Sequence, residues 1–359
     1  MGSISIDVLD LPRLRDEPTF QTLIETLQVL ELNPSRWADS KSELTVAEDT
    51  TGVSRWLTSI MKNSFDWLQD LTHPDSDGIT AAEQLEMLWD LASQRMSERC
   101  GRNAMGELSR TWTIPKSEDH PTLNIEIREP PLTGDNLGFK TWGTAWAIAQ
   151  IFSDFRKDYL SHLLPGNRIN TFTTATGATF TQPQTRVLEL GAGTGLLGLA
   201  AAAVWGANVT MTDLEVIQDN LLFNARKNAG ILEGRGVNVQ CGVLDWKEPE
   251  KQLPLCWDKE FEIVMASDPL YDDGHPSLVA KMIKQHLKPI QGSRAMVAVP
   301  MRDSNTVRMA SKLLSIMASY GFKILHEGAE ICRDDWASDE DEVKCRWWIW
   351  GLSGDEITR

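Results

Sequence analysis

Two side chains that can orient a polar or cationic group lie close together in the segment DPLYDDGHP. Asp268 and Tyr271 occupy positions i and i+3 around a proline, so a tight turn can bring a carboxylate and a phenol together. The phenol can donate a hydrogen bond, and its ring face attracts cations. We take this pair as the candidate reaction centre. Asp272 and Asp273 are interpreted as caps of the next helix, and His275 as a turn residue.

A glycine-rich motif, VLELGAGTGLLG, lies earlier in the chain and is typical of a strand that turns tightly into a helix. Apolar residues precede the turn, and residues 196–203 have a strongly helical composition. Gly191, Gly193 and Gly195 permit the turn to approach a ligand closely. The exposed N–H groups at the helix start favour a negatively charged ligand group.

Two cofactors fit this motif, depending on which glycine opens it. GTGLLG, residues 193–198, matches the dinucleotide fingerprint GxGxxG, and Asp213 follows at the distance expected for a ribose-binding acid. If Gly191 is the first glycine, ELGAGTG places Glu189 in the approach to the turn and resembles motif I of class I S-adenosylmethionine-dependent methyltransferases. A turn without a ligand is the third interpretation. The motif alone leaves all three open.

Acidic side chains also follow two further predicted strands. Asp213 ends the strand ANVTMT, where its carboxylate can accept the ribose hydroxyls of an adenosine or cap the next helix. Asp245 and Trp246 follow the next strand, where they can hold the adenine amine and ring or form a surface turn. Ligands of a parallel sheet bind beyond the carboxyl ends of its strands, so we expect these residues to share a site with the glycine turn.

Net charge and hydrophobicity limit the class of protein. The 359 residues carry a formal charge of −16, which argues against a nucleic-acid backbone as the main partner, because phosphate binding needs clustered lysine and arginine. A basic protein or a neutral small molecule remains as the partner, and the acidity can also serve only to keep the protein soluble. The sequence has no long apolar run and no secretory signal pattern at its start, so we expect no membrane association and a cytoplasmic location.

The cysteines are five in number, scattered, and without CxxC spacing, at positions Cys100, Cys241, Cys256, Cys332 and Cys345. This pattern indicates neither a disulfide framework nor a metal site. We therefore expect reduced, buried thiols.

Strand-like and helix-like segments alternate from residue 185 onward, which predicts an α/β fold around a parallel sheet. The seven expected strands are 185–190, 207–212, 236–241, 261–267, 294–299, 321–326 and 344–350. The expected helices between them are 195–204, 214–229, 276–288 and 304–319. Right-handed crossovers then place helices on both faces, as in a Rossmann-like fold. We expect the last strand to run antiparallel.

The N-terminal part of the chain has a different pattern. Apolar residues three and four apart predict helices between residues 18 and 106. Trp56, Trp67 and Trp89 are expected to pack these helices together. Thr80 and Glu83 have the spacing of a helix capping box.

Between residues 106 and 185, the sequence pattern predicts a hairpin and a loop. SRTWTIP and LNIEIRE alternate as strands do and predict a β-hairpin within residues 108–130. The Thr-rich stretch 165–184 is low in apolar residues and predicts a solvated loop. We divide the chain into an N-terminal helical accessory region, 1–107, and a catalytic domain, 108–359.

The chain resembles the seven-strand methyltransferase family 16, which includes enzymes that methylate protein lysines. The resemblance runs from about Leu123 onward and depends on four segments: GFKTWGTAWAIA at 138–149, ELGAGTGLLG, LDW at 244–246, and the acid-x-x-aromatic signature formed by Asp268 and Tyr271. DPLYDDGHP together with the ending CRWWIW resembles the fungal branch of this family, which includes lysine methyltransferases of translation elongation factors.

The resemblance implies S-adenosylmethionine as the cofactor and a role for each candidate residue. The implied cofactor residues are Trp142 at the methionine end, Glu189, Gly191, Gly193, Gly195 and Asp213 along the cofactor, and Asp245 and Trp246 at the adenine. Asp268 and Tyr271 are implied to line the channel for a lysine side chain.

Lysine methylation needs a neutral amine placed in line with the methyl group, so positioning and desolvation dominate. A nearby carboxylate raises the pKa of an amine, so Asp268 is expected to orient the amine and not to deprotonate it. A protein-lysine N-methyltransferase is the leading hypothesis. A small-molecule methyltransferase and a non-catalytic or dinucleotide-binding protein are the alternatives.

An acidic connection precedes the last predicted strand and contains Asp334, Asp335, Asp339, Glu340, Asp341 and Glu342. It is expected to emerge at the carboxyl edge of the sheet, on the same side as the candidate site. Two interpretations remain, a docking loop for a basic protein such as a translation elongation factor and a solvated turn.

Overall fold

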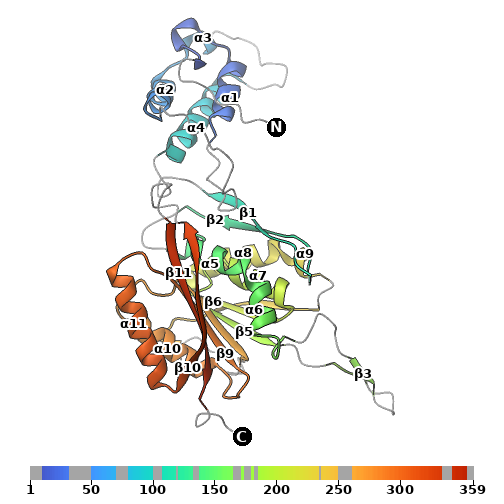
Figure 1. Ribbon diagram of the computed structural model, residues 1–359. Coiled ribbons are helices and arrows are strands. Elements are labelled where there is room, and N and C mark those ends of the chain that lie inside the picture. The colour runs from blue at the N-terminus through green and yellow to red at the C-terminus, as the bar shows by residue number, and fades with distance from the viewer. Residues whose placement is uncertain are drawn as a thin grey trace. The chain divides into compact units, whose positions relative to one another are not determined.

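The computed structural model describes residues 10–31, 50–69, 80–99, 107–118, 120–131, 137–164, 171–173, 179–181, 185–233, 236–249, 261–333 and 342–353. The chain divides into two compact units (Figure 1). Unit 1 comprises residues 1–106 and 131–134, and unit 2 comprises residues 107–130 and 135–359. This structural division does not test which unit is catalytic. That residues 108–359 form the catalytic domain therefore remains a proposal.

Unit 1 is helical in its described part, as predicted. Its elements are the 3-10 helix Leu14–Asp16 and the helices α1 (Phe20–Val29), α2 (Thr50–Lys62), α3 (Asp66–Gln69) and α4 (Ala81–Arg99). Buried leucine and isoleucine side chains from α1, α2 and α4 form one core, against which Trp56 and Trp67 pack. The capping box at the start of α4 is present, because the Thr80 N–H donates to a Glu83 carboxylate oxygen at 2.8 Å and the Glu83 N–H donates to the Thr80 hydroxyl at 3.3 Å.

Unit 2 contains, within its described residues, a seven-stranded sheet with the order β10-β11-β9-β8-β5-β6-β7. The strands are β5 (Arg186–Leu190), β6 (Asn208–Asp213), β7 (Val239–Val243), β8 (Ile263–Ser267), β9 (Arg294–Pro300), β10 (Phe322–Arg333) and β11 (Glu342–Leu352). Strands β5 to β9 pair in parallel, whereas β11 runs antiparallel to both β9 and β10. The predicted Rossmann-like fold with an antiparallel last strand is confirmed.

Helices cover both faces of this sheet (Figure 1). The helices of unit 2 are α5 (Gly143–Gln150), α6 (Phe152–Asp158), α7 (Leu196–Trp205), α8 (Glu215–Lys227), α9 (Ala229–Leu232), α10 (His275–His286) and α11 (Ser304–Ser319), with a 3-10 helix at Leu137–Phe139. Figure 1 shows α10 and α11 on one face, and α5, α7 and α8 on the other. The main core fills the space between the sheet and the α10–α11 layer.

The central strands read as continuous apolar runs because both of their faces are covered. All residues of β8 from Ile263 to Ala266 are buried, and so are Val187 to Leu190 of β5. Every residue of α7 is buried as well, which explains why this helix is apolar on all sides. The glycine turn is therefore held between two buried elements, β5 and α7, that restrict its movement.

The hairpin of β1 (Leu108–Ile114) and β2 (Leu123–Glu129) is fastened to α8 by asparagine side chains. Asn224 and Asn228 lie four residues apart, so both face the same way. Each accepts a β2 N–H and donates to a β2 carbonyl, at distances of 2.7–3.0 Å. Asn224 also donates to the carbonyl of Thr194 in the glycine turn, at 2.9 Å. The side-chain amide of Asn224 thus connects the hairpin to the glycine turn.

Two expectations differ from the structure. The Thr-rich stretch, expected to be a loop, contains the short paired strands β3 (Thr171–Thr173) and β4 (Thr179–Thr181), because alternating β-branched and aromatic residues favour strands. The expectation of reduced cysteines was wrong for one pair, since Cys332 in β10 and Cys345 in β11 form a disulfide with their Cα atoms 6.3 Å apart. The pairing of β10 with β11 brings these two cysteines together. Their spacing in the sequence does not indicate that they are close.

No helix in the described part of the chain is both long and apolar enough to cross a membrane. The acidic residues at 334, 335 and 339–341 lie outside the described residues. Glu342 begins β11.

Candidate active site

The glycine turn holds backbone conformations that side chains disfavour. Gly191, Gly193 and Gly195 have φ angles of +70°, +55° and +88°. A Cβ atom on Gly193 would lie 3.2 Å from the carbonyl oxygen of Gly138. One on Gly191 would lie 3.1 Å from the ring of Trp246. Glycine is therefore required both for the turn itself and for the close approach of its neighbours.

Asp213 ends β6, and its carboxylate is bound to the glycine turn. One oxygen accepts the N–H of Gly193 and the other accepts the N–H of Leu214, both at 2.7 Å. Leu214 is the N-cap residue of α8, so Asp213 does not occupy the cap position. Burial raises the pKa of Asp213, and the two N–H donors oppose that shift. A carboxylate has about four acceptor sites, so capacity remains for two ribose hydroxyls.

Asp245 and Trp246 follow β7, as the strand-end argument predicts. Asp245 accepts the N–H of Lys247 at 2.8 Å, which fixes the turn after the strand. The Trp246 ring meets the His275 ring edge-on, with centroids 5.7 Å apart. Trp246 therefore bridges the end of β7 and the start of α10.

Trp142 immediately precedes α5, and its neighbour Thr141 attaches this segment to the rest of the site. The Thr141 N–H donates to the buried carboxylate of Glu129 at 3.0 Å, and its hydroxyl bonds to the Thr194 hydroxyl at 2.8 Å. The indole N–H of Trp142 donates to the carbonyl of Leu137 at 3.1 Å. These bonds hold Trp142 beside the glycine turn.

Asp268 follows β8 in the left-handed backbone region, with a φ of +53°. Aspartate tolerates this region better than most residues. Its N–H donates to the carbonyl of Ala298 in β9 at 2.8 Å. Its carboxylate, only 7% exposed, accepts two hydrogen bonds from the guanidinium of Arg302, at 3.0 and 2.6 Å.

Tyr271 lies three residues further on and is 60% exposed. Its ring packs edge-on against His275, with centroids 4.2 Å apart, and its N–H donates to His275 Nδ1 at 3.4 Å. The pKa of Tyr271 is raised, chiefly because the phenol is partly desolvated where it borders the cavity and further by three nearby carboxylates. The phenol is therefore a neutral hydrogen-bond donor at neutral pH.

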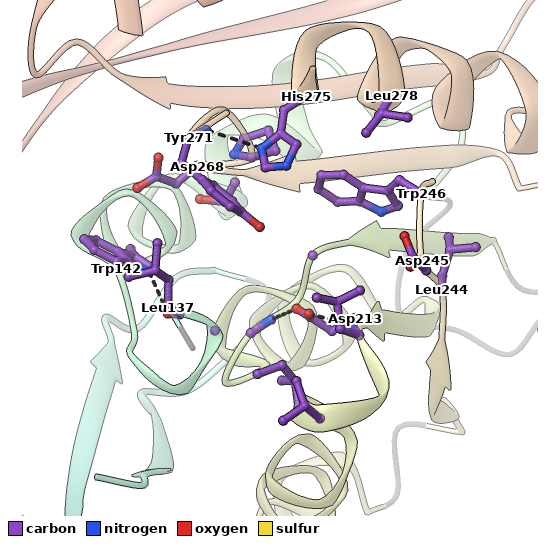
Figure 2. Close-up of a pocket in the computed structure, with 18 of the residues that line it drawn as sticks. Leu137, Trp142, Asp213, Leu244, Asp245, Trp246, Asp268, Tyr271, His275 and Leu278 are labelled. Atoms are coloured by element: carbon purple, nitrogen blue, oxygen red, sulfur yellow. Dashed lines mark hydrogen bonds between the residues drawn. The ribbon is translucent and has the colours of Figure 1, made fainter. Parts of the chain in front are cut away.

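These segments enclose one cavity of about 380 Å³ at the carboxyl edge of the sheet, within the range of small-ligand sites. The predicted site residues that line it are Trp142, Gly191, Gly193, Asp213, Asp245, Trp246, Asp268 and Tyr271. Figure 2 shows Trp142 and Asp268 on one side of the cavity and Asp245 and Trp246 on the other, with Asp213 between them. Residues from four strand ends thus meet at one site.

Glu189 and Gly195 do not line this cavity. Glu189 is buried in β5, and its carboxylate packs against Gly198 of α7, where a Cβ atom would lie 2.4 Å from Oε2. Burial first, and the charge of Asp213 second, raise the pKa of Glu189 well above its usual value. Gly195 is the N-cap of α7. For both residues, contact with the cofactor stays a prediction.

Sequence reasoning missed Arg302 and undervalued His275. Arg302 lies two residues after β9, at the same carboxyl edge, so the strand-end argument could have found it. His275 begins α10, lines the cavity and is 7% exposed. Its pKa is lowered, chiefly by burial, so the ring is neutral at pH 7.

Comparison with known proteins decides the family. A model of the lysine methyltransferase family matches residues 120–314, which is more than half of the chain. The chain belongs to this family. It is therefore an S-adenosylmethionine-dependent lysine methyltransferase.

Three relatives illustrate how far the likeness to lysine methyltransferases extends. The protein-lysine N-methyltransferase rrg1 of Schizosaccharomyces pombe is 27% identical over 352 residues, which are 96% of this chain and 98% of the relative. The protein-lysine N-methyltransferase EFM2 of Saccharomyces cerevisiae is 31% identical over 257 residues, 70% of this chain and 57% of EFM2. The protein N-lysine methyltransferase METTL21A of Danio rerio is 39% identical over 103 residues, 28% of this chain and 44% of METTL21A.

The geometry of this lysine methyltransferase fits S-adenosylmethionine better than a dinucleotide. The N–H of Gly193 is bound to Asp213, and the N–H of Gly195 is bound to the carbonyl of Ala192 at 2.8 Å. A pyrophosphate would need these donors and would meet the carboxylate of Asp213. A cofactor that carries ribose hydroxyls and no phosphate avoids both conflicts. The dinucleotide interpretation is therefore set aside.

Proposed function

We propose that this protein transfers a methyl group from S-adenosylmethionine to the side-chain amine of a lysine in another protein. The observation that carries the proposal is the single cavity lined by both the cofactor residues around Asp213 and the pair Asp268 and Tyr271. The printed names of rrg1 and EFM2, both protein-lysine N-methyltransferases, support a protein as the substrate. A translation elongation factor as that protein, and a cytoplasmic location, are parts of the proposal that derive from the sequence.

The cofactor, when bound, would supply a methyl group on a sulfonium: a neutral amine would form the new N–C bond, and the sulfur would leave with the S–C electron pair as neutral S-adenosylhomocysteine. The residues of this chain position the cofactor and the lysine side chain relative to each other. Trp142 and Asp213 border the cofactor space, and Asp268 and Tyr271 border the space for the incoming side chain. The protonated phenol of Tyr271 can donate to the amine, and its exposed ring can contact the methylene groups of a lysine. Correct alignment of two reactants is the main source of rate in such a transfer.

The charge of the protein favours a basic partner. The formal charge is −16, and Asp339, Glu340, Asp341 and Glu342 form a run of acids before or at the start of β11. Opposite charges steer association and are sensitive to salt. We propose that this run contacts the basic surface around the target lysine. Replacing its four acids with amides should lower the rate of substrate capture without changing cofactor affinity.

The function is tested by incubating the purified protein with tritium-labelled S-adenosylmethionine and a protein extract freed of small molecules. We expect a discrete labelled protein band whose acid hydrolysate contains methyllysine. Label only in added small metabolites would instead favour the small-molecule alternative. No label in any fraction would contradict the proposal.

Asp268→Ala tests the reaction centre in the same assay. It should abolish labelling while S-adenosylhomocysteine still binds. The matched control is Asp273→Ala, because Asp273 also pairs with an arginine, Arg308, at 2.7 Å, yet is exposed and does not line the cavity. The control variant should label normally.

A further inference from the structure

Arg302 connects Asp268, which borders the acceptor side of the cavity, with Trp142, which borders the cofactor space. Its guanidinium binds Asp268 with both terminal nitrogens, in the two-pronged geometry that suits arginine and carboxylate. Its Cζ atom also lies 5.0 Å from the centroid of the Trp142 ring. Its side chain is 31% exposed and lines the cavity. Arg302 is therefore fixed on two sides and still faces the space for substrate.

This arrangement addresses an electrostatic problem in lysine methylation. Only the neutral amine can attack the methyl group, whereas an unpaired carboxylate beside it would favour the ammonium form. Asp268 would be such a carboxylate if Arg302 were absent, and its side chain is nearly buried. A permanent cation bound to both oxygens cancels most of that effect, because arginine stays charged at all relevant pH values.

We propose that Arg302 is a positioning residue that holds and neutralises Asp268, so that this carboxylate orients the target amine without stabilising its protonated form. The inference rests on the proposed function, because it requires a lysine as acceptor. Trp142 aligns the guanidinium from the other side. The arginine thus sets the pH range in which the enzyme works.

Other charged or titratable groups face this region and are shared by every variant compared below. They are Lys140, Asp213, Asp245, Lys247, Tyr271, Asp272, His275 and Asp303. The difference between two pH profiles therefore isolates the charge of Arg302.

The test is the single-turnover rate of labelling of the main protein band, with enzyme and cofactor in saturating excess so that the rate reports the bound complex, from pH 6.5 to 10. The rate should rise with pH as the target amine loses its proton. Arg302→Gln should move this rise to higher pH by about one unit, so that activity falls about tenfold near neutral pH and recovers in alkali. Arg302→Lys, which keeps the charge, should retain the wild-type profile at a lower plateau. The double variant with Asp268→Asn should lower the plateau but return the rise to its wild-type position.

Arg308→Gln is the matched control, because Arg308 pairs with an exposed carboxylate outside the cavity. It should change neither rate nor profile. A uniform loss at every pH in Arg302→Gln, or a loss of S-adenosylhomocysteine affinity with it, would overturn the proposal in favour of a purely structural role. An unlabelled wild-type reaction would overturn the proposed function, and this inference with it.

Discussion

The cofactor side of the cavity is fixed by the backbone of the glycine turn and by its bond to one carboxylate, whereas the acceptor side is fixed by a pair of side chains. On the cofactor side, the glycine turn has fixed positive φ angles, and its N–H at Gly193 is bound to Asp213. On the acceptor side, Asp268 is bound by the side chain of Arg302, and Tyr271 is 60% exposed.

The difference indicates which parts can adjust to a ligand. A glycine turn held between the buried elements β5 and α7 has few alternative conformations, so the cofactor side is preorganised. Side-chain pairs at an opening can exchange partners when a substrate arrives. We expect substitutions on the first side to act on cofactor affinity and substitutions on the second to act on turnover.

Gly193→Val should have the largest effect and tests the preorganised side. Its Cβ would lie 3.2 Å from the carbonyl oxygen of Gly138, at a φ of +55°. A left-handed conformation costs a residue with a side chain about 1–2 kcal/mol, and disturbing the bond to Asp213 adds a similar amount. Affinity for S-adenosylhomocysteine should fall about 100-fold by calorimetry. Gly230→Ala, where a Cβ meets no atom within 4 Å, is the control and should bind normally.

Asp213→Ala should weaken S-adenosylhomocysteine binding about 10- to 100-fold, since a hydrogen bond to a charged group contributes about 1.5–3 kcal/mol. The turn also loses its acceptor at Gly193. Asp219→Ala, an exposed acid on α8 that does not line the cavity, should bind as the wild type does. Equal affinities for the two variants would remove Asp213 from the cofactor site.

Tyr271→Phe should lower turnover roughly 3- to 10-fold. It removes the hydrogen bond from the phenol to the amine, and one neutral hydrogen bond contributes about 0.5–1.5 kcal/mol. Cofactor affinity should stay unchanged, because the phenol lies on the acceptor side. Steady-state labelling at saturating cofactor measures the first quantity, and calorimetry measures the second. If affinity falls instead of turnover, the division of the cavity into two sides is incorrect.

The smallest effect is a dependence of stability on pH that arises from His275. Its pKa is lowered in the fold from a usual value of 6.5, chiefly by burial, so the unfolded chain binds more protons just below that pH. The contribution to stability is complete above pH 6.5 and is lost as the pH falls below it. The thermal midpoint should therefore decrease between pH 7 and pH 5.5. His275→Gln should reduce that decrease, and an identical slope in both proteins would exclude His275 as the source.

The cofactor side could be predicted from the sequence because its constraints are local. Gly191 and Gly193 adopt conformations that glycine accepts most readily, and such positions are visible in a single motif. Asp213 and Asp245 follow from one rule, that parallel strands end at one edge of the sheet. The role of each residue toward the cofactor stays a prediction.

The acceptor side was less predictable because its contacts join distant segments. Arg302 and Asp268 are 34 residues apart in the sequence, and no spacing rule predicts that they form a pair. His275 has the surroundings of a turn in the sequence, yet its burial follows from contacts with Tyr271 and Trp246. The disulfide between Cys332 and Cys345 likewise depends on how β10 pairs with β11.

The last described strand, β11, lies inside the sheet, between β9 and β10. During synthesis on the ribosome, both neighbours expose an unpaired strand edge until residues 342–352 have emerged. Such edges are templates for aggregation. The nascent chain therefore stays vulnerable to aggregation until β11 has emerged, and insertion of β11 between β9 and β10 is the step that protects it.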